Sequence, residues 1–500
     1  MGGETAEVRH AKTIQRETQI SEQIPLTTMW ECRWEALKRT DADVQAFMAT
    51  YEEPLHINPR DALTGGRVNA AKLYHATMEG EKVHYYDFTS LYPSVMSKCL
   101  YPTGAPELIF DNFDSLDDYF GFIRCKITPP RGLFHPVLPF RYQGKLLFPL
   151  CRTCVETQQV TPCTHTDIER QLSATWTTPE LQKAVSVGYT LDEIERVWHF
   201  PSSSNGLFKD YMQRFLKLKQ EASGYPPGVV TDVEKDEYIR DYLANEGVAL
   251  DKDAILYNPA LRLVSKLCMN STWGKFCERE ERTTTEIVGS QSRFSQLMFS
   301  DQYRVSQFAF LSPKVAVVTY KNPDKTKSSE CSNLFVGCFT TAYGRLALYN
   351  LLEKLGRRVI YYDTDSVIFS EREGEWMPPT GPYLGDLTSE LAADDFIVEF
   401  VSLGPKSYAY RTHRKHSQVK CKGVTLNARN SAVVTFDTMS ALVRGFVEKT
   451  EVTPLTTSIA TIKRNKKTFT LHNATLSRKL QVVYTKRIPL PDFTTLPYGF

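Results

Sequence analysis

The sequence predicts a mixed α and β protein made of several domains or subdomains. Runs rich in β-branched and aromatic residues predict strands at 83–86, 315–320, 359–362 and 367–369. Segments with helical spacing of apolar residues lie between these runs. A length of 500 residues exceeds what one hydrophobic core usually supports, so about three domains or subdomains are expected.

Three segments predict helices. Asn258 offers an N-cap oxygen, Pro259 suits a first helical position and Gly274 can end the helix, which predicts a helix over 259–273. Apolar residues recur at helical spacing over 207–221 and again over 341–355. The Gly-Tyr-Pro-Pro-Gly stretch at 224–228 predicts a turn between helices.

Composition and charge exclude several classes of protein. Hydrophobic residues make up 42% and charged residues 24%, which excludes wholesale disorder. With 60 Lys and Arg against 58 Asp and Glu, a histone-like polyanion binder is excluded. Eleven irregularly spaced cysteines predict an intracellular, reduced protein, and the lack of long apolar runs predicts a soluble one without a membrane span. Residues 1–24 are polar and predict a mobile tail.

Three aspartates lie at predicted strand ends. Asp363 and Asp365 occupy a polar turn between two apolar runs, which predicts a hairpin with acids at its apex. The strand at 82–87 ends in a third acid, Asp87. Three carboxylates on neighbouring strand ends would bind hard divalent cations such as Mg²⁺. The alternative is an Asp-rich turn whose side chains are merely hydrated.

The helix at 259–273 supplies the opposite charge. Arg262, Lys266, Asn270 and Trp273 are spaced by four, four and three, so about 100° per residue places them on one stripe. Such a stripe can bind a triphosphate whose other side is held by metal. The alternative is an ordinary amphipathic helix with a solvated basic face.

Together these strings resemble family B DNA polymerases. Asp87-Phe-Thr-Ser-Leu-Tyr-Pro-Ser94, Lys266-Leu-Cys-Met-Asn-Ser-Thr-Trp-Gly274 and Tyr362-Asp-Thr-Asp-Ser366 resemble that family's A, B and C motifs, and Lys406-Ser-Tyr408 resembles its KxY motif. The chain is most similar to the protein-primed subgroup of organelles and viruses, and within it to the self-synthesising Maverick/Polinton transposons. The resemblance implies an α+β right-hand fold with an antiparallel-sheet palm, helical fingers and a thumb.

The resemblance also implies a role for each motif residue. Asp87 and Asp365, with the Phe88 carbonyl, would hold two Mg²⁺ or Mn²⁺ ions, and Asp363 would be a nearby carboxylate. These ions would activate a primer 3′-hydroxyl and neutralise the leaving pyrophosphate, to which Lys266 could donate a proton. The implied deoxynucleotide-binding residues are Ser90, Leu91, Tyr92, Arg262, Lys266, Asn270 and Trp273.

Basic segments and a glycine pair indicate DNA contacts. The segment 401–436 contains seven Lys and Arg residues and no acid, with tyrosines among them, which suits a surface that follows a duplex backbone. Leu63-Thr-Gly-Gly-Arg67 resembles the family's YxGG template-contact motif, with Leu63 in place of Tyr. The expected DNA-binding residues are Gly65, Gly66, Arg67, Lys406, Tyr408 and Lys422.

The motif order predicts a division into domains. The expected segments are a tail at 1–24, a pre-palm template-contact segment at 25–80, a first palm segment with a Cys-rich insertion at 81–205, fingers at 206–275, a second palm segment at 276–400, and the KxY segment and thumb at 401–500. Full family members carry an N-terminal exonuclease, for which residues 1–80 are too few. We therefore expect no exonuclease domain and a chain shortened at its N-terminus.

The Cys-rich insertion contains a potential metal site. Cys151, Cys154, Cys163 and His165 are four soft or borderline ligands within fifteen residues, which suits one tetrahedral Zn²⁺. The alternative is a set of free buried thiols. The insertion lies between motifs A and B, where protein-primed polymerases contact the priming protein.

The expected function is DNA-directed DNA polymerisation by two-metal phosphoryl transfer, with primer–template DNA, deoxynucleotides and a terminal priming protein as partners. One alternative is a truncated, inactive transposon-derived DNA-binding protein. A DxD glycosyltransferase would have no need for Tyr92 or the Arg262 stripe, and a reverse transcriptase has adjacent aspartates, which Thr364 separates here. A transposon origin would imply a nuclear location.

Overall fold

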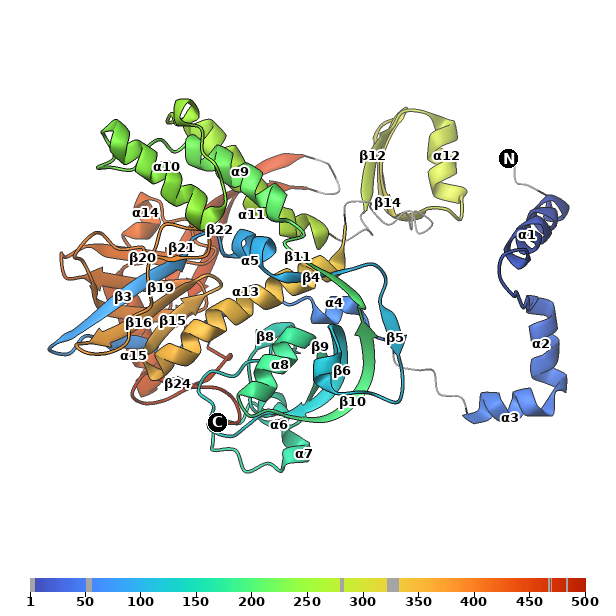
Figure 1. Cartoon of the computed structure of the whole chain (residues 1–500), viewed down its shortest axis with the longest axis horizontal. Coiled ribbons are helices and arrows are strands. Elements are labelled where there is room, and N and C mark those ends of the chain that lie inside the picture. The colour runs from blue at the N-terminus through green and yellow to red at the C-terminus, as the bar shows by residue number, and fades with distance from the viewer. Residues whose placement is uncertain are drawn as a thin grey trace. The chain divides into compact units, whose positions relative to one another are not determined.

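The computed structural model describes residues 5–50, 56–278, 283–321, 332–465, 468, 470–482 and 484–500. The chain divides into two compact units, Met1–His56 and Ile57–Phe500. Figure 1 shows the helices and strands of each unit, coloured along the chain.

The smaller unit consists of helices α1 (Ala6–Ser21), α2 (Glu31–Thr40) and α3 (Ala42–Thr50), in which no residue is buried among those described. The segment 1–24, predicted to be a mobile tail, therefore contains a helix over Ala6–Ser21. The Thr5 side chain accepts a hydrogen bond from the Val8 N–H at the N-terminus of α1, and Glu7 lies in the first turn. Local capping and helix propensity, rather than packing, account for this helix.

An antiparallel sheet forms the centre of the larger unit. The strand order is β1-β15-β16-β3-β18-β19-β20, with β17 beside β3 and β2 beside β18. The strands are β1 (Val68–Ala70), β2 (Tyr74–Ala76), β3 (Glu81–Phe88), β15 (Val359–Asp363), β16 (Ser366–Arg372), β17 (Leu387–Ser389), β18 (Ile397–Gly404), β19 (Ser407–Thr412) and β20 (Ser417–Cys421). Strands β1, β2, β19 and β20 lie outside the ranges predicted for the palm, yet they pair with it.

Helices cover both faces of this sheet (Figure 1). On one face Leu348 and Leu352 of α13 (Leu334–Leu355) pack against Tyr362 and Phe369. On the other face α15 (Phe436–Glu448) contributes its buried apolar side to the largest core cluster. This burial on two faces explains the near-continuous apolar runs that predicted β15 and β16.

Helix α13 begins seven residues before the predicted start. The Asn333 side chain caps it by accepting a hydrogen bond from the Val336 N–H, a signal that the apolar spacing alone does not contain. The predicted end before Gly356 is confirmed.

A second sheet has the strand order β5-β10-β6-β9, and its strands precede helices α9–α11 in the sequence. Its core includes Trp176, Ile123 and Leu181, the last from α8. The elements of this region are α4 (Pro59–Ala62), α5 (Leu91–Lys98), β4 (Leu100–Thr103), β5 (Glu107–Ile109), β6 (Gly121–Thr128), β7 (Phe140–Tyr142), β8 (Lys145–Leu147), α6 (Arg152–Glu156), α7 (Asp167–Arg170), β9 (Leu172–Thr177), α8 (Thr178–Ser186), β10 (Thr190–His199) and β11 (Ser202–Asn205).

Three helices form the region predicted as fingers: α9 (Lys209–Glu221), α10 (Asp232–Glu246) and α11 (Pro259–Phe276). The predicted turn at 224–228 lies between α9 and α10. Helix α11 continues past Gly274, which was expected to end it, because that glycine keeps helical geometry and the C-cap is Cys277.

The range predicted as the second palm segment also contains a separate small sheet. Strands β12 (Thr284–Val288), β13 (Arg304–Ser312) and β14 (Val315–Lys321) pack with α12 (Gln291–Phe299) around their own apolar cluster. Near the C-terminus lie α14 (Ala428–Ser431), a long hairpin of β21 (Leu455–Arg464) and β22 (Leu471–Leu480), and the short pair β23 (Ile488–Pro489) and β24 (Thr495–Leu496). Among the described helices, none has the length and apolar character needed to cross a membrane.

Candidate active site

The sheet brings the three predicted acids together. Asp87 lies at the end of β3 opposite Ser366 of β16, and Asp363 lies opposite Ser366 across the β15–β16 hairpin. The Phe88 N–H donates a hydrogen bond to the Asp365 carbonyl over 2.7 Å, which ties the two strand ends. The turn itself is tight, because Thr364 has φ +62°. The predicted hairpin with acids at its apex is confirmed.

A cavity of about 510 Å³ opens over these acids. It is bounded by side chains from β3, from the β15–β16 turn and from β19 and β20. Its lining residues are Tyr85, Asp87, Asp363, Thr364, Asp365, Ser366, Glu390, Lys406, Tyr408 and Lys420.

The acids at this cavity repel one another. Burial raises the pKa of Asp87 to about 7, and the neighbouring carboxylates of Asp365 and Glu390 contribute to this rise. Burial and then Asp363 also raise the pKa of Asp365. A cluster of half-buried carboxylates is stabilised when a cation neutralises it. The residues therefore fit a divalent cation site.

Cations on two helices, α9 and α11, act electrostatically on one another and on the acids. The charge of Lys266 on α11 acts on Asp87 and favours its ionised form. On α9, burial and the charges of Arg262 and Lys266 lower the pKa of Lys219. Three neighbouring cations, two of which disfavour protonation of the third, Lys219, form a site suited to a polyphosphate. Arg262 also donates from Nε to the Ser223 hydroxyl over 3.1 Å.

Two aromatic side chains meet between α5 and α11. The rings of Tyr92 and Trp273 lie with centroids 4.7 Å apart at 40°. Burial raises the pKa of Tyr92 to about 12, so its hydroxyl stays neutral. A Cβ at Gly344 of α13 would lie 2.8 Å from the Tyr92 ring, so this glycine makes room for it. The Oδ1 atom of Asn270 is buried and accepts no hydrogen bond from the described residues.

The other two residues predicted to contact the nucleotide, Ser90 and Leu91, differ in backbone conformation and burial. Ser90 has a left-handed backbone, φ +53°, just before α5. Leu91 is only 3% exposed, so its side chain is buried and the predicted nucleotide contact would be made by its backbone. On α11, Leu263, Val264 and Leu267 are exposed, so the apolar side of this helix is largely uncovered.

The glycine pair supports the acidic turn from beneath. The Thr364 N–H donates to the Arg67 carbonyl over 2.8 Å. A Cβ at Gly66 would lie 2.5 Å from the Thr364 hydroxyl oxygen, whereas a Cβ at Gly65 would meet nothing within 4 Å. Arg345 of α13 holds the same loop through the carbonyls of Thr64 and Gly65.

We expect Gly66→Ala to destabilise the protein by about 1–3 kcal/mol, the usual cost of overpacking a close contact. The added methyl group would displace Thr364 and with it the turn that carries Asp363 and Asp365. Chemical denaturation measures the loss, and Gly65→Ala is the matched control with little effect. Equal losses in both variants would contradict this role for Gly66.

Arg67 does not lie at the surface. Its side chain is 1% exposed, and its guanidinium stacks 4.2 Å from the centre of the Phe148 ring. Nε and Nη2 find no hydrogen-bond partner among the described residues of the chain. The prediction that this side chain binds DNA is corrected, because a basic residue beside a Gly-Gly pair can equally be enclosed by aromatic rings.

The KxY residues lie at the cavity wall. Lys406 Nζ is 2.7 Å from Oδ1 of Asp363, so this lysine pairs with a predicted catalytic carboxylate. The ring of Tyr408 is 3% exposed, and its hydroxyl hydrogen-bonds that of Tyr85 over 2.9 Å. Tyr408 thus supports the cavity wall, and its predicted DNA contact stays a prediction.

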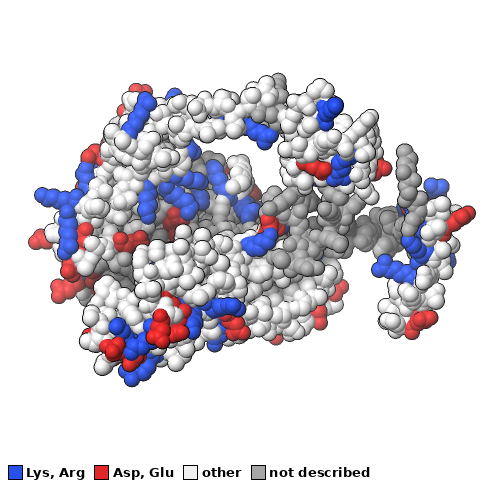
Figure 2. All heavy atoms as spheres, turned by 90° about the horizontal axis from the view of Figure 1, so that it is seen from above, with Lys and Arg blue, Asp and Glu red and all other residues white. Residues whose placement is uncertain are grey.

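Two further lysines, Lys422 and Lys486, lie near Lys406. Lys422 is exposed, and burial together with Lys422 and Lys406 lowers the pKa of Lys486. Figure 2 shows Lys and Arg side chains gathered around a hollow in one face of the larger unit. This arrangement gives the cavity a basic rim next to its acidic floor.

Several site residues were missed in the sequence. Tyr85 could have been found, because it lies two positions before Asp87 and so shares its face of β3. Lys420 reaches the Tyr85 hydroxyl over 3.3 Å from β20. Glu390 follows β17, and its N–H donates to the Tyr85 carbonyl over 2.9 Å, a long-range contact without a local signal.

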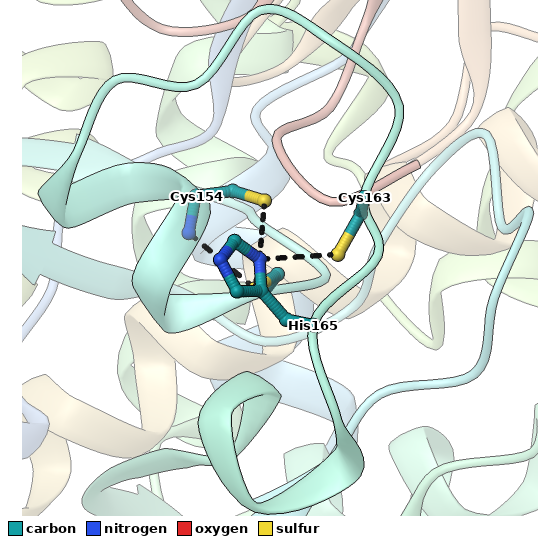
Figure 3. A group of neighbouring side chains, drawn as sticks. Cys154, Cys163 and His165 are labelled. Atoms are coloured by element: carbon teal, nitrogen blue, oxygen red, sulfur yellow. Dashed lines mark hydrogen bonds between the residues drawn. The ribbon is translucent and has the colours of Figure 1, made fainter.

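The four predicted zinc ligands are also brought together. Their ligand atoms all lie within 4.8 Å of one another, and Figure 3 shows the thiols of Cys154 and Cys163 directed at the His165 ring.

The larger unit has the fold of a DNA polymerase. Phi29 DNA polymerase in complex with primer-template DNA and incoming nucleotides aligns with 89% of this chain at a TM-score of 0.53 and 16% identity, and its complex with primer-template DNA aligns with 85% at 0.52 and 18%. The predicted α+β polymerase fold is confirmed. The chain spans 66% and 62% of those two structures.

The sequence comparisons identify the type of polymerase that the chain is similar to. Residues 37–227 match the family of type B DNA polymerases, organellar and viral. A "Probable DNA polymerase" of Ascobolus immersus is 38% identical over 90 residues, which are 18% of this chain and 7% of that protein.

Proposed function

We propose that this chain is a DNA-directed DNA polymerase of the protein-primed type B class, which adds deoxynucleotides to a primer 3′-hydroxyl. The observation that carries the proposal is one cavity with Asp87 and Asp365 on its floor and Lys266 of α11 acting on it from the fingers side. Phosphoryl transfer depends on this combination of charges, because the protein mainly positions and neutralises the reacting groups.

Asp87 and Asp365, with the Phe88 carbonyl, would hold two Mg²⁺ or Mn²⁺ ions. The mutual repulsion of these half-buried carboxylates supports this assignment. Bound ions would lower the pKa of the primer hydroxyl and neutralise charge on the leaving group. Asp363 pairs with Lys406 at 2.7 Å and would orient the turn rather than bind metal directly.

The cations of the fingers would bind the triphosphate. Arg262 and Lys266 lie on the stripe predicted for this role, and Lys219 adds a third charge from α9. Lys266, whose charge also acts on Asp87, would donate a proton to departing pyrophosphate.

Tyr92, Asn270 and Trp273 would border the new base pair. The Tyr92 ring is held between Trp273 and Gly344, so it has little freedom to move away from a ribose 2′-hydroxyl. Oδ1 of Asn270, which accepts no hydrogen bond from the part of the chain that the structure describes, would accept one from the nucleotide.

We expect Tyr92→Val to relax sugar discrimination by roughly 10- to 200-fold, the effect of about 1–3 kcal/mol of lost steric exclusion. Primer extension with deoxy- and ribonucleotides measures the ratio of the two rates. Tyr257→Val, at an exposed tyrosine just before α11, is the control and should keep the wild-type ratio. An unchanged ratio in Tyr92→Val would remove Tyr92 from the sugar gate, and failure of the wild-type chain to extend any primer would contradict the proposed activity.

The basic rim of Lys406, Lys422 and Lys486 would contact the primer–template backbone near the acids, with Gly65 exposed on the loop below. Such contacts imply binding that weakens with salt and has little sequence preference.

A terminal priming protein and a transposon origin belong to the same proposal. They are supported by the resemblance of the motifs to the protein-primed subgroup and its Maverick/Polinton members, and a transposon origin would carry the expectation of a nuclear location. The inactive DNA-binding alternative has no specific support, since the three acids line one cavity and the rings of Tyr92 and Trp273 lie in contact.

A further inference from the structure

Three thiols surround one nitrogen in the Cys-rich insertion. The Sγ atoms of Cys151, Cys154 and Cys163 lie 3.6, 3.3 and 3.6 Å from Nδ1 of His165. In a tetrahedral zinc site, Zn–S and Zn–N bond lengths of about 2.3 and 2.0 Å place sulfur and nitrogen roughly 3.5 Å apart. The side chains are therefore spaced as ligands of one ion would be (Figure 3).

Hydrogen bonding alone does not explain this convergence. A neutral imidazole nitrogen offers either one N–H or one lone pair, so Nδ1 of His165 cannot satisfy three thiols. The cluster is also only partly enclosed, since Cys151 and Cys154 are buried while Cys163 and His165 are not. A set of packed apolar thiols would not direct its sulfur atoms at one histidine nitrogen.

The backbone around the cluster supports thiolate ligands. Cys151 is the N-cap of α6, and its sulfur accepts a hydrogen bond from the Cys154 N–H at 3.4 Å. Arg131 donates to the carbonyls of Cys163 and His165, which fixes the second half of the loop. Backbone donors and a nearby guanidinium stabilise the negative charge of a three-thiolate site.

The C-terminal segment of the chain packs on this cluster. The Leu150 N–H donates to the Tyr498 carbonyl over 2.7 Å. A Cβ at Gly499 would clash with Cβ of Cys151, so the segment passes in direct contact with a predicted ligand. Tyr498, Cys151 and Cys154 share one apolar cluster, and the end of the chain passes beside the site in Figure 3.

The same segment is fastened to the central sheet at its other end. Thr495 donates from its N–H to the Ala71 carbonyl over 2.8 Å and from its hydroxyl to the Ala70 carbonyl over 2.8 Å. The buried guanidinium of Arg487 donates to both oxygens of Thr495. Ala70 ends β1, which pairs with β15 and so borders the strand that carries Asp363.

We propose that Cys151, Cys154, Cys163 and His165 bind one structural Zn²⁺, and that this ion fastens the C-terminal segment 495–500 to the Cys-rich insertion. The ion closes the loop 151–165 into the surface against which Tyr498 and Gly499 pack. Without the ion the loop 151–165 would lose this surface, because at a structural zinc site the free energy of metal binding stabilises the folded form of the loop.

Metal analysis of the full chain, purified under reducing conditions, tests the site. We expect about one equivalent of zinc in the wild type, and none in Cys163→Ser because that variant loses one of four ligands. Cys32→Ser, at an exposed cysteine of the other unit, is the matched control and should keep the zinc. If the wild-type protein holds no zinc, even after incubation with Zn²⁺, the site is refuted.

Since Cys163→Ser could misfold, two measurements use the wild-type chain. Replacement of zinc by Co²⁺ should produce the visible absorption of a tetrahedral thiolate site, and an octahedral spectrum would refute the ligand set. Hydrogen exchange before and after chelation should show faster exchange at the Leu150 N–H and in 495–500, with β3 and β16 unchanged. Unchanged exchange in 495–500 would refute the fastening role. None of these readouts involves nucleotide incorporation, so they are independent of the proposed polymerase activity.

Discussion

Asp365→Asn should lower the rate of nucleotide incorporation by on the order of 10³-fold or more, because the divalent cation proposed for this site would supply several kcal/mol of transition-state stabilisation. The substitution keeps the shape of the side chain and removes one of the two half-buried carboxylates, Asp87 and Asp365, that line the cavity. Single-turnover primer extension measures the effect.

DNA binding separates this loss from misfolding. The basic residues around the cavity are untouched by Asp365→Asn, so affinity for a primer–template at fixed salt should stay near the wild-type value. Asp437→Asn, at an exposed acid of α15, is a control that should retain activity. A parallel loss of binding and incorporation in Asp365→Asn would show that Asp365 acts on folding and not on chemistry.

Glu180→Gln should destabilise the larger unit by about 3–5 kcal/mol, the cost of leaving a buried charge without its partner. Arg345 of α13 and Glu180 of α8 form a bidentate pair at 2.8 and 3.0 Å, with side chains only 3% and 2% exposed. The same guanidinium holds the Thr64 and Gly65 carbonyls, so loss of Glu180 also weakens the loop beneath the acidic turn.

Denaturant titration of Glu180→Gln measures the change, and Glu193→Gln is the matched control. The Lys126–Glu193 pair is exposed on the second sheet, and such pairs contribute about 0–1 kcal/mol. A loss in Glu180→Gln no larger than in Glu193→Gln would contradict the assigned role of the buried pair.

Parts of the candidate site could be predicted from the sequence where residues close together in the chain determine the local backbone structure. The Asp363–Asp365 hairpin is bounded by apolar runs, and the α11 stripe follows from helical periodicity. Both features need only neighbours in sequence, so their positions were predictable, and the roles of their residues stay predictions.

Residues placed by long-range pairing were not predictable in this way. Glu390 reaches the cavity because the backbone after β17 pairs with β3, which lies far away in the sequence. Arg67 is enclosed by Phe148, Tyr349 and Tyr362, which come from three separate segments. Local sequence shows a basic residue beside glycines, and only the tertiary fold decides that it is buried.

Single-nucleotide incorporation tests the central claim most directly. The full chain is incubated with a labelled primer–template, Mg²⁺ and one deoxynucleotide at a time. We predict extension by the nucleotide complementary to the template, and loss of extension on chelation of the metal. DNA binding without any templated, metal-dependent extension would contradict the assignment of this cavity as a polymerase active site.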